Sequence, residues 1–389
     1  MGESKLRFKA DDGSDFPDWE DKTLGELFHI SAGGDIDRNN CAAKQSKDYP
    51  YPVYANALVN NGTYGYANYY KIDGDTFTVT GRGDVGHAVA RHCMYVPIVR
   101  LLVCQPNMDD DVDFFAEQIN YTRVFIESTG VPQLTAPQLS KIKVKRPTLP
   151  EQRKIADLLS AVDAVIAAQQ AEVDAWEQRK KGVMQKLFSQ EVRFKADDGS
   201  DFPDWEEKTL GEITGLFVGK SFTSELNKNG RYVVMDMGSV SSDGSIIDAK
   251  LTDLDRDILR RGDLIMPKDD IGGGLIIGKT AYIPCDDKYV CGDHVYRLRF
   301  DSEIDGLFMH YEINSSGPQR RLGRKVTGSA QLGLNSKSVS SETVSVPSLP
   351  EQRKIADCLS SMDEVIQKSK DELAKWQELK KGLLQQMFV

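Results

Sequence analysis

A nine-residue stretch, LPEQRKIAD, occurs at residues 149–157 and again at residues 349–357. After each copy, apolar residues recur at alternating steps of four and three, which keeps one narrow apolar face on a helix. Such a face suits a coiled-coil partner better than a globular core. Pro150 and Pro350 fit a first helical turn, where the backbone N–H has no partner to lose. The sequence therefore predicts two long helices, each beginning at one copy of the stretch.

The two apolar faces are interrupted at matching places, by Gln169 or Ser369 and then by Lys180 or Lys380. Polar residues at seam positions fix the register between two particular helices. We therefore expect each helix to pair with the other one. The predicted seam positions are Ile155, Leu159, Val162, Ile166, Gln169, Val173, Trp176, Lys180, Val183 and Leu187 in the first helix, and Ile355, Leu359, Met362, Ile366, Ser369, Leu373, Trp376, Lys380, Leu383 and Met387 in the second.

A second repeat runs out of phase with the first. The segment RFKADDGSDFPDWE at residues 7–20 recurs unchanged at residues 193–206, and each copy leads into a TLGE sequence. Repeats on this scale indicate two similar units that face each other across a pseudo-twofold axis, with the end of the second helix near the N-terminal linker. The predicted order is a linker at 1–22, a domain at 23–148, a helix at 149–188, a linker at 189–208, a domain at 209–348 and a helix at 349–389.

Composition agrees with a folded protein of two domains. The chain has 389 residues, 28% of them charged, and most of its formal charge of −10 lies in the two linkers. The sequence has no apolar run of membrane-spanning length and no signal peptide. Six scattered cysteines favour reduced thiols and a cytoplasmic location. Cys285, Cys291 and His294 form at most part of a metal site, because no fourth ligand lies nearby.

The segments between linkers and helices indicate short strands and turns. Residues 76–80 alternate like a strand, and residues 232–236 and 262–266 are strand-rich. Gly81 to Gly86 matches GxGxxG, but the β-branched and aromatic residues that follow predict a strand–turn–strand and not a dinucleotide site. Lys268 to Gly274 takes the corresponding place in the second domain. Residues 113–127 are expected to be helical and 128–148 irregular. The predicted fold class is α+β, with two similar mostly-β domains joined by two long antiparallel coiled-coil helices.

Catalytic motifs are hard to find in the sequence. It has no GxSxG, HExxH, Walker loop or paired CxxC, and only five histidines. Residues 17–22, PDWEDK, superficially match a nuclease signature, but the spacing is too tight to bring a carboxylate pair and a lysine around one metal. The sequence therefore favours a recognition module over an enzyme.

The repeats resemble those of a known family. Two variable domains begin with TLGE, contain a GxxQL run (Gly130–Leu134 and Gly328–Leu332), and precede helices that open with LPEQRKIA and end with WxxxKKGxxQxxF. This pattern, which covers nearly the whole chain, resembles the specificity subunit of type I restriction-modification systems. The resemblance implies that each variable domain is a target recognition domain that reads one half of a bipartite, asymmetric site in double-stranded DNA. The helices would space the two domains.

The resemblance also implies partners and cofactors. The partners would be two adenine-N6 methyltransferase subunits, to which the helices dock, and two restriction/translocase subunits in the full enzyme. The chain itself would be non-catalytic and would hold no cofactor. S-adenosylmethionine would belong to the methyltransferase, and ATP and magnesium to the endonuclease.

A helix over residues 150–188 would span about 58 Å at ~1.5 Å per residue. This length is comparable with about 17 base pairs at ~3.4 Å each.

Base contacts need hydrogen-bond donors and acceptors on loops, so the candidates follow from residue chemistry alone. Gln133 and Gln331 also match the family's glutamine-containing run, where backbone contacts or domain packing are equally compatible roles. The predicted DNA-binding residues are Tyr54, Asn56, Asn60, Asn61, Tyr64, Arg82, His87, Arg91 and Gln133 in the first domain, and Lys220, Ser221, Lys228, Lys268, Lys279, Arg320, Arg321, Arg324, Lys325 and Gln331 in the second.

Two other functions stay open at this point. The chain could be a coiled-coil scaffold that binds proteins without DNA specificity, or an endonuclease that uses the PDWE-containing linkers. Neither function accounts for two divergent domains on a repeated frame.

Overall fold

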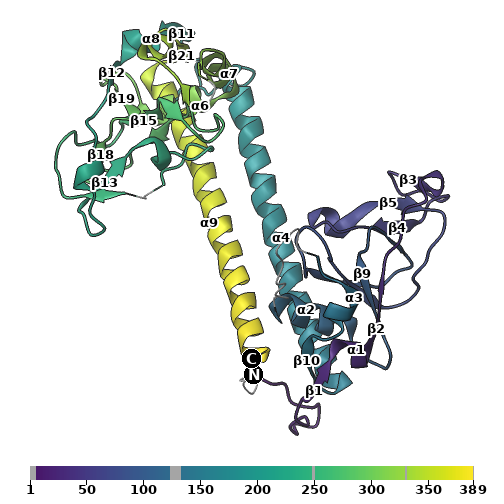
Figure 1. Ribbon diagram of the computed structural model, residues 1–389. Coiled ribbons are helices and arrows are strands. Elements are labelled where there is room, and N and C mark those ends of the chain that lie inside the picture. The colour runs from purple at the N-terminus through teal and green to yellow at the C-terminus, as the bar shows by residue number, and fades with distance from the viewer. Residues whose placement is uncertain (1–5, 123–132, 248–249, 329–330, 389) are drawn as a thin grey trace. The chain divides into compact units, whose positions relative to one another are not determined.

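The computed structural model describes residues 6–122, 133–247, 250–328 and 331–388 (Figure 1). The chain divides into two compact units, one formed by residues 1–170 with 371–389 and the other by residues 171–370. Each unit contains one β-rich domain and one half of each long helix. The N-terminal MGESK, the GVP part of the first GxxQL run and the SA part of the second lie outside the described residues.

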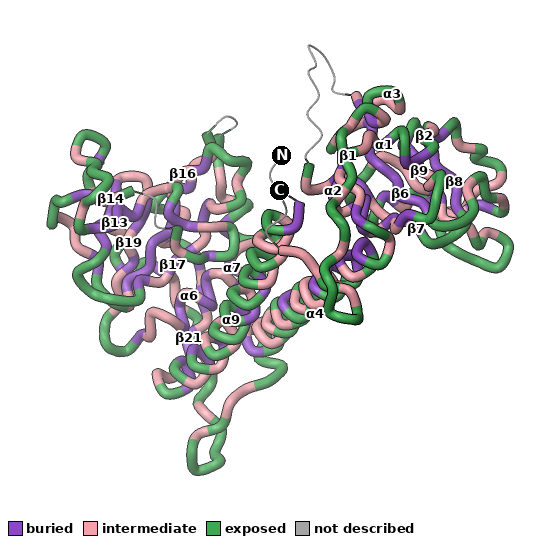
Figure 2. The backbone as a smooth tube through the Cα atoms, turned by 90° about the horizontal axis from the view of Figure 1, so that it is seen from below, coloured by how far each residue is buried: buried purple, intermediate pink, exposed green. Residues whose placement is uncertain are grey.

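The two long helices form as the heptad pattern predicts. Helix α4 spans Leu149–Phe188 and helix α9 spans Leu349–Met387. Every predicted seam residue is buried or half-buried, and the opposite faces are exposed (Figure 2). In the first unit Lys380 of α9 binds Asp163 of α4 at 2.8 Å, and in the second unit Lys180 of α4 binds Asp363 of α9 at 2.5 Å. These pairs confirm an antiparallel pairing of the two helices.

The helix ends do more than pair with each other, which corrects the expectation of a purely coiled-coil seam. Ile155 and Leu159 at the start of α4 pack in the first domain's core with Met387 and Phe388 from the end of α9. Leu187 at the end of α4 packs with the start of α9 in the second domain's core. The terminal turns of the heptad faces are therefore part of two globular cores.

The first β-rich domain contains a four-stranded antiparallel sheet in the order β2-β9-β6-β7, a second sheet β3-β5-β4-β8 in which β4 and β8 are parallel, and a two-stranded pair of β1 and β10. Three short helices, α1–α3, pack against the four-stranded sheet of this domain (Figure 1). The bounds are β1 Glu20–Thr23, α1 Leu24–Leu27, β2 Phe28–Ala32, β3 Cys41–Ala42, β4 Tyr51–Tyr54, β5 Thr63–Ala67, β6 Thr76–Val79, β7 Ala88–Arg91, β8 Val96–Pro97, β9 Leu102–Pro106, α2 Val112–Thr122, α3 Ala136–Leu139 and β10 Lys143–Arg146, with 3₁₀ turns at Arg38–Asn40 (η1) and Val59–Gly62 (η2).

The second β-rich domain repeats this plan. Its four-stranded sheet has the order β12-β19-β15-β17, and β13 and β18 form the parallel pair of a second sheet, β14-β13-β18. The bounds are β11 Glu206–Thr209, α5 Leu210–Ile213, β12 Gly215–Phe217, η3 Thr223–Glu225, β13 Tyr232–Met235, η4 Met237–Ser239, β14 Leu251–Thr252, β15 Leu264–Pro267, β16 Asp269–Asp270, β17 Ala281–Tyr282, β18 Tyr289–Cys291, β19 Val295–Arg299, α6 Gly306–Asn314, α7 Ser316–Arg324, β20 Leu332–Gly333, α8 Ser336–Ser340 and β21 Thr343–Val346.

Some local predictions for the first domain are confirmed and one is wrong. Residues 81–86 connect the antiparallel strands β6 and β7, so the strand–turn–strand interpretation of the GxGxxG match is confirmed. The expected helix begins at Val112 and is described as far as Thr122. The prediction of an irregular run at 128–148 is wrong over its described part, because α3 and β10 lie there. Strand β10 forms because its partner β1, far away in sequence, supplies the hydrogen bonds.

Each repeated linker docks on the start of a long helix. The side chain of Glu151 is fully buried and accepts hydrogen bonds from Arg7 at 3.1 and 2.8 Å and from Trp19 Nε1 at 3.1 Å. In the second unit, Glu351 is bound in the same way by Arg193 and Trp205. The N-terminal segment also meets the end of α9, where Leu6 N donates to Gln386 O (Figure 1). The repeated sequence therefore closes each unit around a buried carboxylate.

Candidate nucleic-acid interface

One loop in each domain stands at the same place in the sheet. We call residues 80–87, between β6 and β7, recognition loop 1, and residues 268–279, between β15 and β17, recognition loop 2. Loop 1 is closed at its base, because Thr80 N donates to His87 O at 2.9 Å and Gly86 N donates to Thr80 O at 2.8 Å. In loop 2 the buried Asp270 carboxylate accepts from Gly272 N and Ile276 N at 2.5 and 3.3 Å.

Tyr54, Asn56 and Arg91 lie beside recognition loop 1 but are engaged with other protein groups. Arg91 is only 6% exposed, and its guanidinium stacks 3.7 Å from the Tyr54 ring centroid and donates to Asn61 O at 2.7 Å. Burial lowers the pKa of Arg91. Asn56 donates to Val99 O and accepts from Gly81 N, both at 2.7 Å. These three residues therefore attach the segment between β4 and β5 to the base of recognition loop 1.

The other first-domain candidates are exposed or half-buried. Asn60 and Asn61 are exposed at φ 52° and 50°, the left-handed region that asparagine tolerates better than most residues. Tyr64 is 58% exposed. Arg82 and Gln133 come together across the loop, with the guanidinium donating to Gln133 Oε1 at 3.4 Å. His87 is half-buried at the end of the loop, and burial, with Arg91 nearby, lowers its pKa.

The second-domain candidates do not form one cluster. Lys220, Ser221 and Lys228 are exposed on the segment between β12 and β13. Lys268 is half-buried at the start of recognition loop 2, and Gln331 is exposed next to β20, which pairs with β16 of that loop. The remaining candidates, which lie on or near α7 or at the end of the loop, are Lys279, Arg320, Arg321, Arg324 and Lys325.

Arg321 and Lys325 are held by one buried carboxylate. Glu342 is 1% exposed and accepts from Arg321 Nε at 2.6 Å and from Lys325 Nζ at 2.8 Å. Arg321 also donates to Thr343 O at 2.7 Å. This arrangement attaches α7 to the start of β21. Arg320 and Arg324 lie on the same helix and, like Arg321, are exposed.

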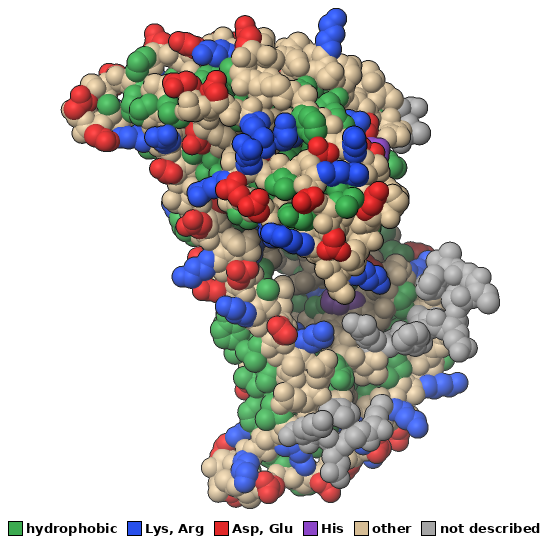
Figure 3. Space-filling view, turned by 90° about the vertical axis from the view of Figure 1, so that its left-hand side faces the viewer, with side chains coloured by type: hydrophobic (Ala, Val, Ile, Leu, Met, Phe, Trp, Pro, Cys, Tyr) green, Lys and Arg blue, Asp and Glu red, His purple; other side chains and the backbone are tan. Residues whose placement is uncertain are grey.

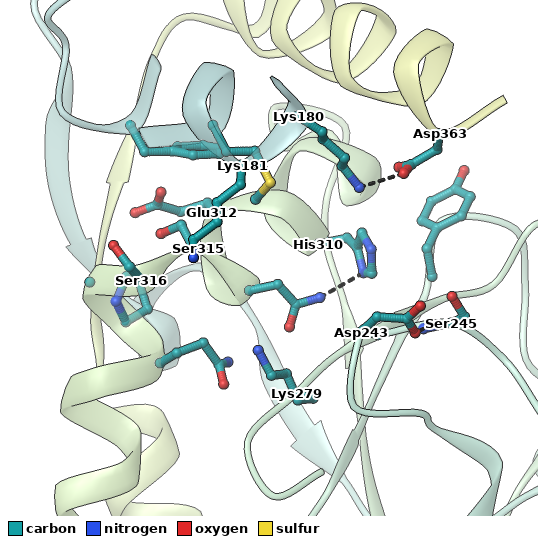
Figure 4. A pocket seen from close by; sticks show the side chains of 18 of the residues that line it. Lys180, Lys181, Asp243, Ser245, Lys279, His310, Glu312, Ser315, Ser316 and Asp363 are labelled. Atoms are coloured by element: carbon teal, nitrogen blue, oxygen red, sulfur yellow. Dashed lines mark hydrogen bonds and ion pairs between the residues drawn. The ribbon is translucent and has the colours of Figure 1, made fainter. Parts of the chain in front are cut away.

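Lys279 faces a pocket of about 1530 Å³ in the second unit (Figure 4). The pocket also contains Lys180, which points at Asp363, and His310. Burial lowers the pKa of Lys279, and it lowers the pKa of His310 to about 4, so this imidazole is neutral. Both lysines and carboxylates line the walls of the pocket. The pocket therefore has no uniform positive charge that would attract an anion.

The first unit has a matching pocket of about 1210 Å³. Its walls include His87, at the position of Lys279, and Lys380, at the position of Lys180. Lys380 bridges Asp163 at 2.8 Å and Glu117 of α2 at 3.1 Å, and burial raises the pKa of Glu117. The two lysines that the heptad pattern assigns to helix register therefore also attach each β-rich domain to the helix pair.

Two features of this region escaped the sequence analysis. Asn120 and Asn314 bind the ends of the recognition loops, and the shared pattern DxxFxxxxIN, at Asp111–Asn120 and Asp305–Asn314, could have identified them. The alignment of the GxxQL runs is also misleading. Leu134 N donates to Gly81 O, and Leu334 N, not that of Leu332, donates to the equivalent Lys268 O. Gln133 and Gln331 therefore do not occupy equivalent positions.

Lys and Arg mix with Asp and Glu over the face seen in Figure 3. Within the described ranges no group of three or more His, Cys, Asp and Glu side chains could hold a metal ion. Cys285 is exposed, Cys291 is buried and His294 binds Asp269 at 2.9 Å. None of the described helices has the length and apolar content needed to cross a membrane.

Comparisons with known proteins identify the family. A family model described as the type I restriction modification DNA specificity domain matches residues 17–175 and again residues 203–375. The type I restriction enzyme MjaVIII specificity subunit of Methanocaldococcus jannaschii is 28% identical over 296 residues, which are 71% of this chain and 69% of that protein.

Solved structures agree on the fold. The chain is similar, at 16% identity and a TM-score of 0.69, to the S subunit of a type I restriction-modification system from M. genitalium, over 100% of this chain and 99% of that one. A second structure, from work on assembly and conformational transition of the type I R-M system, has a TM-score of 0.54 at 16% identity, over 96% and 98% of the two chains. Because the family model matches most of the chain in both halves, the chain belongs to the specificity subunits of type I restriction-modification systems, which are the non-catalytic DNA specificity subunits of these complexes.

Proposed function

We propose that residues 23–148 and residues 209–348 are two target recognition domains, each of which reads one half of a bipartite DNA site. The observation that carries this proposal is a repeated frame with divergent loops. Both units bury the same glutamate under the same linker and build the same four-stranded sheet, whereas recognition loops 1 and 2 differ in length and residues. Selection for two different half-sites accounts for that contrast.

The candidate residues divide into two roles under this proposal. Side chains that are exposed or border a loop contact DNA, because base edges and phosphates require free donors and acceptors. Side chains that are buried, or that contact a buried charged side chain or the backbone of another segment, hold the loops in place. The contacting set is Asn60, Asn61, Tyr64, Arg82, His87, Gln133, Lys220, Ser221, Lys228, Lys268, Lys279, Arg320, Arg324 and Gln331, and the supporting set is Tyr54, Asn56, Arg91, Arg321 and Lys325.

The partners follow from the same proposal. Helices α4 and α9 dock two adenine-N6 methyltransferase subunits, which supply S-adenosylmethionine. Two restriction/translocase subunits join in the full complex with ATP and magnesium. The second similar structure comes from work on complex assembly of the type I system, which supports the association of such a chain with other subunits.

Methylome sequencing tests the proposal. Cells expressing this chain with its methyltransferase subunit should acquire N6-methyladenine at one bipartite motif. Arg82→Ala should relax the motif in one half, because a base-reading arginine contributes about 1–3 kcal/mol of discrimination. Arg324→Ala should change only the other half or overall occupancy. A motif without two separated halves, or an Arg82→Ala change in both halves, would contradict the proposal.

A further inference from the structure

Both recognition loops end in the same two hydrogen bonds. In the first unit, Asn120 Oδ1 accepts from Ala88 N at 2.8 Å, and its Nδ2 donates to Ala88 O at 2.9 Å. In the second unit, Asn314 Oδ1 accepts from Thr280 N at 2.9 Å, and its Nδ2 donates to Thr280 O at 2.9 Å. A carboxamide can do this because it carries a donor and an acceptor side by side. Ala88 and Thr280 are the first residues after loops 1 and 2.

The other end of each loop is also fixed in an equivalent way. Leu134 N donates to Gly81 O at 2.9 Å in the first unit, and Leu334 N donates to Lys268 O at 2.7 Å in the second. Both leucine side chains are buried, at 3% and 2% exposure. Each loop is therefore held at both ends, although the residues between the ends differ. Repetition of the anchors in divergent loops indicates that loop placement is what the two domains share.

The helix that carries each asparagine also contacts the coiled coil. Three residues before Asn120, Glu117 accepts from Lys380 at 3.1 Å, and Lys380 also binds Asp163 of α4. Three residues before Asn314, Tyr311 donates to Asp363 of α9 at 2.7 Å, and Lys180 lies 5.0 Å from the Tyr311 ring centroid. Residues three apart share one side of a helix. Each of α2 and α6 thus connects one recognition loop to the helix pair.

We propose that Asn120 and Asn314 are positioning residues for DNA reading, each holding one recognition loop in a fixed position relative to the coiled coil. The inference rests on the proposed function and adds the groups that place the reading side chains. His87 and Lys279 directly precede the clamped residues, so their side chains depend most directly on the clamp. Neither asparagine needs to touch DNA.

The test uses the chain in complex with its methyltransferase subunit. Asn120→Asp keeps the size of the side chain but replaces the donor to Ala88 O with a carboxylate oxygen. Methyl-transfer rates are measured on duplexes that carry single base-pair changes in one half-site or the other. We expect about a tenfold loss of discrimination in the half-site read by the first domain and none in the other, because loss of one net hydrogen bond corresponds to at most about that factor. Asn314→Asp should give the mirror result.

Controls separate positioning from general stability. Asn68→Asp removes an exposed amide hydrogen bond to Asn40 in the same domain and should leave discrimination unchanged. Equal loss at both half-sites, unchanged discrimination in both variants, or loss of cooperative unfolding in Asn120→Asp would each overturn the inference. If the unmodified complex methylates without sequence preference, the proposed function itself fails. That outcome is distinguishable, because it appears before any substitution is made.

Discussion

Buried carboxylates at the helix starts explain why the linker sequence is repeated without change. Glu151 and Glu351 lie in the first turn of α4 and α9, where the positive end of the helix favours a negative charge. Each is fully buried, so each also needs a cation and hydrogen-bond donors from outside the helix. Arg7 with Trp19, and Arg193 with Trp205, supply them. The same linker residues at the same spacing are therefore required in both units.

The first prediction concerns Arg7. Arg7→Met should destabilise the chain by about 3–5 kcal/mol, because it leaves the Glu151 carboxylate buried without a cation. Urea unfolding measures the loss. Lys9→Met is the matched control, because Lys9 and its partner Asp15 are 65% and 85% exposed and such pairs contribute about 0–1 kcal/mol. Equal effects of the two substitutions would contradict the role of the buried pair.

Glu312 is a buried acid whose counterpart in the first unit is neutral. It is 5% exposed, and burial raises its pKa to about 7. It accepts from Ser345 N at 3.2 Å, whereas Gln118, at the same place in the first domain, donates to Lys145 O at 3.0 Å. Below the ordinary glutamate pKa of 4.5 this carboxyl is mostly neutral in both the folded and the unfolded chain. As the pH rises towards 7 the unfolded chain gains from ionising and the folded chain does not, so stability falls.

The second prediction follows from that sign. Glu312→Gln should leave stability nearly unchanged at about pH 4 and raise it by up to about 3 kcal/mol at about pH 8, since each pKa unit corresponds to about 1.4 kcal/mol. Urea unfolding of both proteins at the two pH values provides the comparison. Gln118→Glu is the reciprocal variant and should lower stability only at the higher pH. A pH-independent difference between Glu312→Gln and the unmodified chain would show that ionisation is not the cause.

At the scale of secondary-structure elements, the two long helices carry the repeated contacts. Lys180 and Lys380 interrupt the apolar seams, and each ion pair joins α4 to α9. Seam lysines lower stability in a coiled coil but restrict its register. The register is therefore set by the same side chains that reach α2 and α6. The length of the helices between these contacts can therefore change without a change in either domain.

The third prediction uses that independence. If helix length sets the spacer of the DNA site, insertion of four residues after both Gln169 and Ser369 should lengthen the spacer by one or two base pairs. Four residues add about 6 Å at ~1.5 Å per residue, and a base-pair step is ~3.4 Å. The insertion turns the following seam by only about 40°, so packing can continue as a stutter. Methylation mapping measures the spacer length. An active variant with an unchanged spacer would show that helix length does not set it.

At the scale of the whole chain, one structural plan occurs twice with different loops. The sheets β2-β9-β6-β7 and β12-β19-β15-β17 have the same order, and each unit has its own core, linker clamp and loop anchors. Most stabilising contacts of a domain therefore lie within one unit. A domain built in this way can diverge in its loops without loss of the frame.

The fourth prediction is that the domains can be exchanged. Replacement of residues 23–148 with the corresponding domain of a related specificity subunit should change one half of the methylated site and keep the other half. The substituted domain needs an asparagine at the position of Asn120 and an acid or hydroxyl group facing Lys380. Replacement of residues 209–348 serves as the reciprocal exchange. Changes in both halves, or loss of folding in both exchanges, would show that the units are not modular.

Periodicity and repetition in the sequence were enough to predict the two helices, their pairing and the family, and residue types predicted the turn at 81–86. These features depend on spacings within a few residues or on near-identical segments, so one sequence carries the information. Which of the polar candidates are buried or held by buried groups was decided only by the tertiary structure. Arg91 and Arg321 have the same chemistry as Arg82 and Arg324, but their partners Asn61 and Glu342 come from other elements of the fold. Strand β10 and the asparagine clamps likewise exist because distant segments supply their hydrogen-bond partners, and only the clamps leave a sequence pattern, the repeated DxxFxxxxIN.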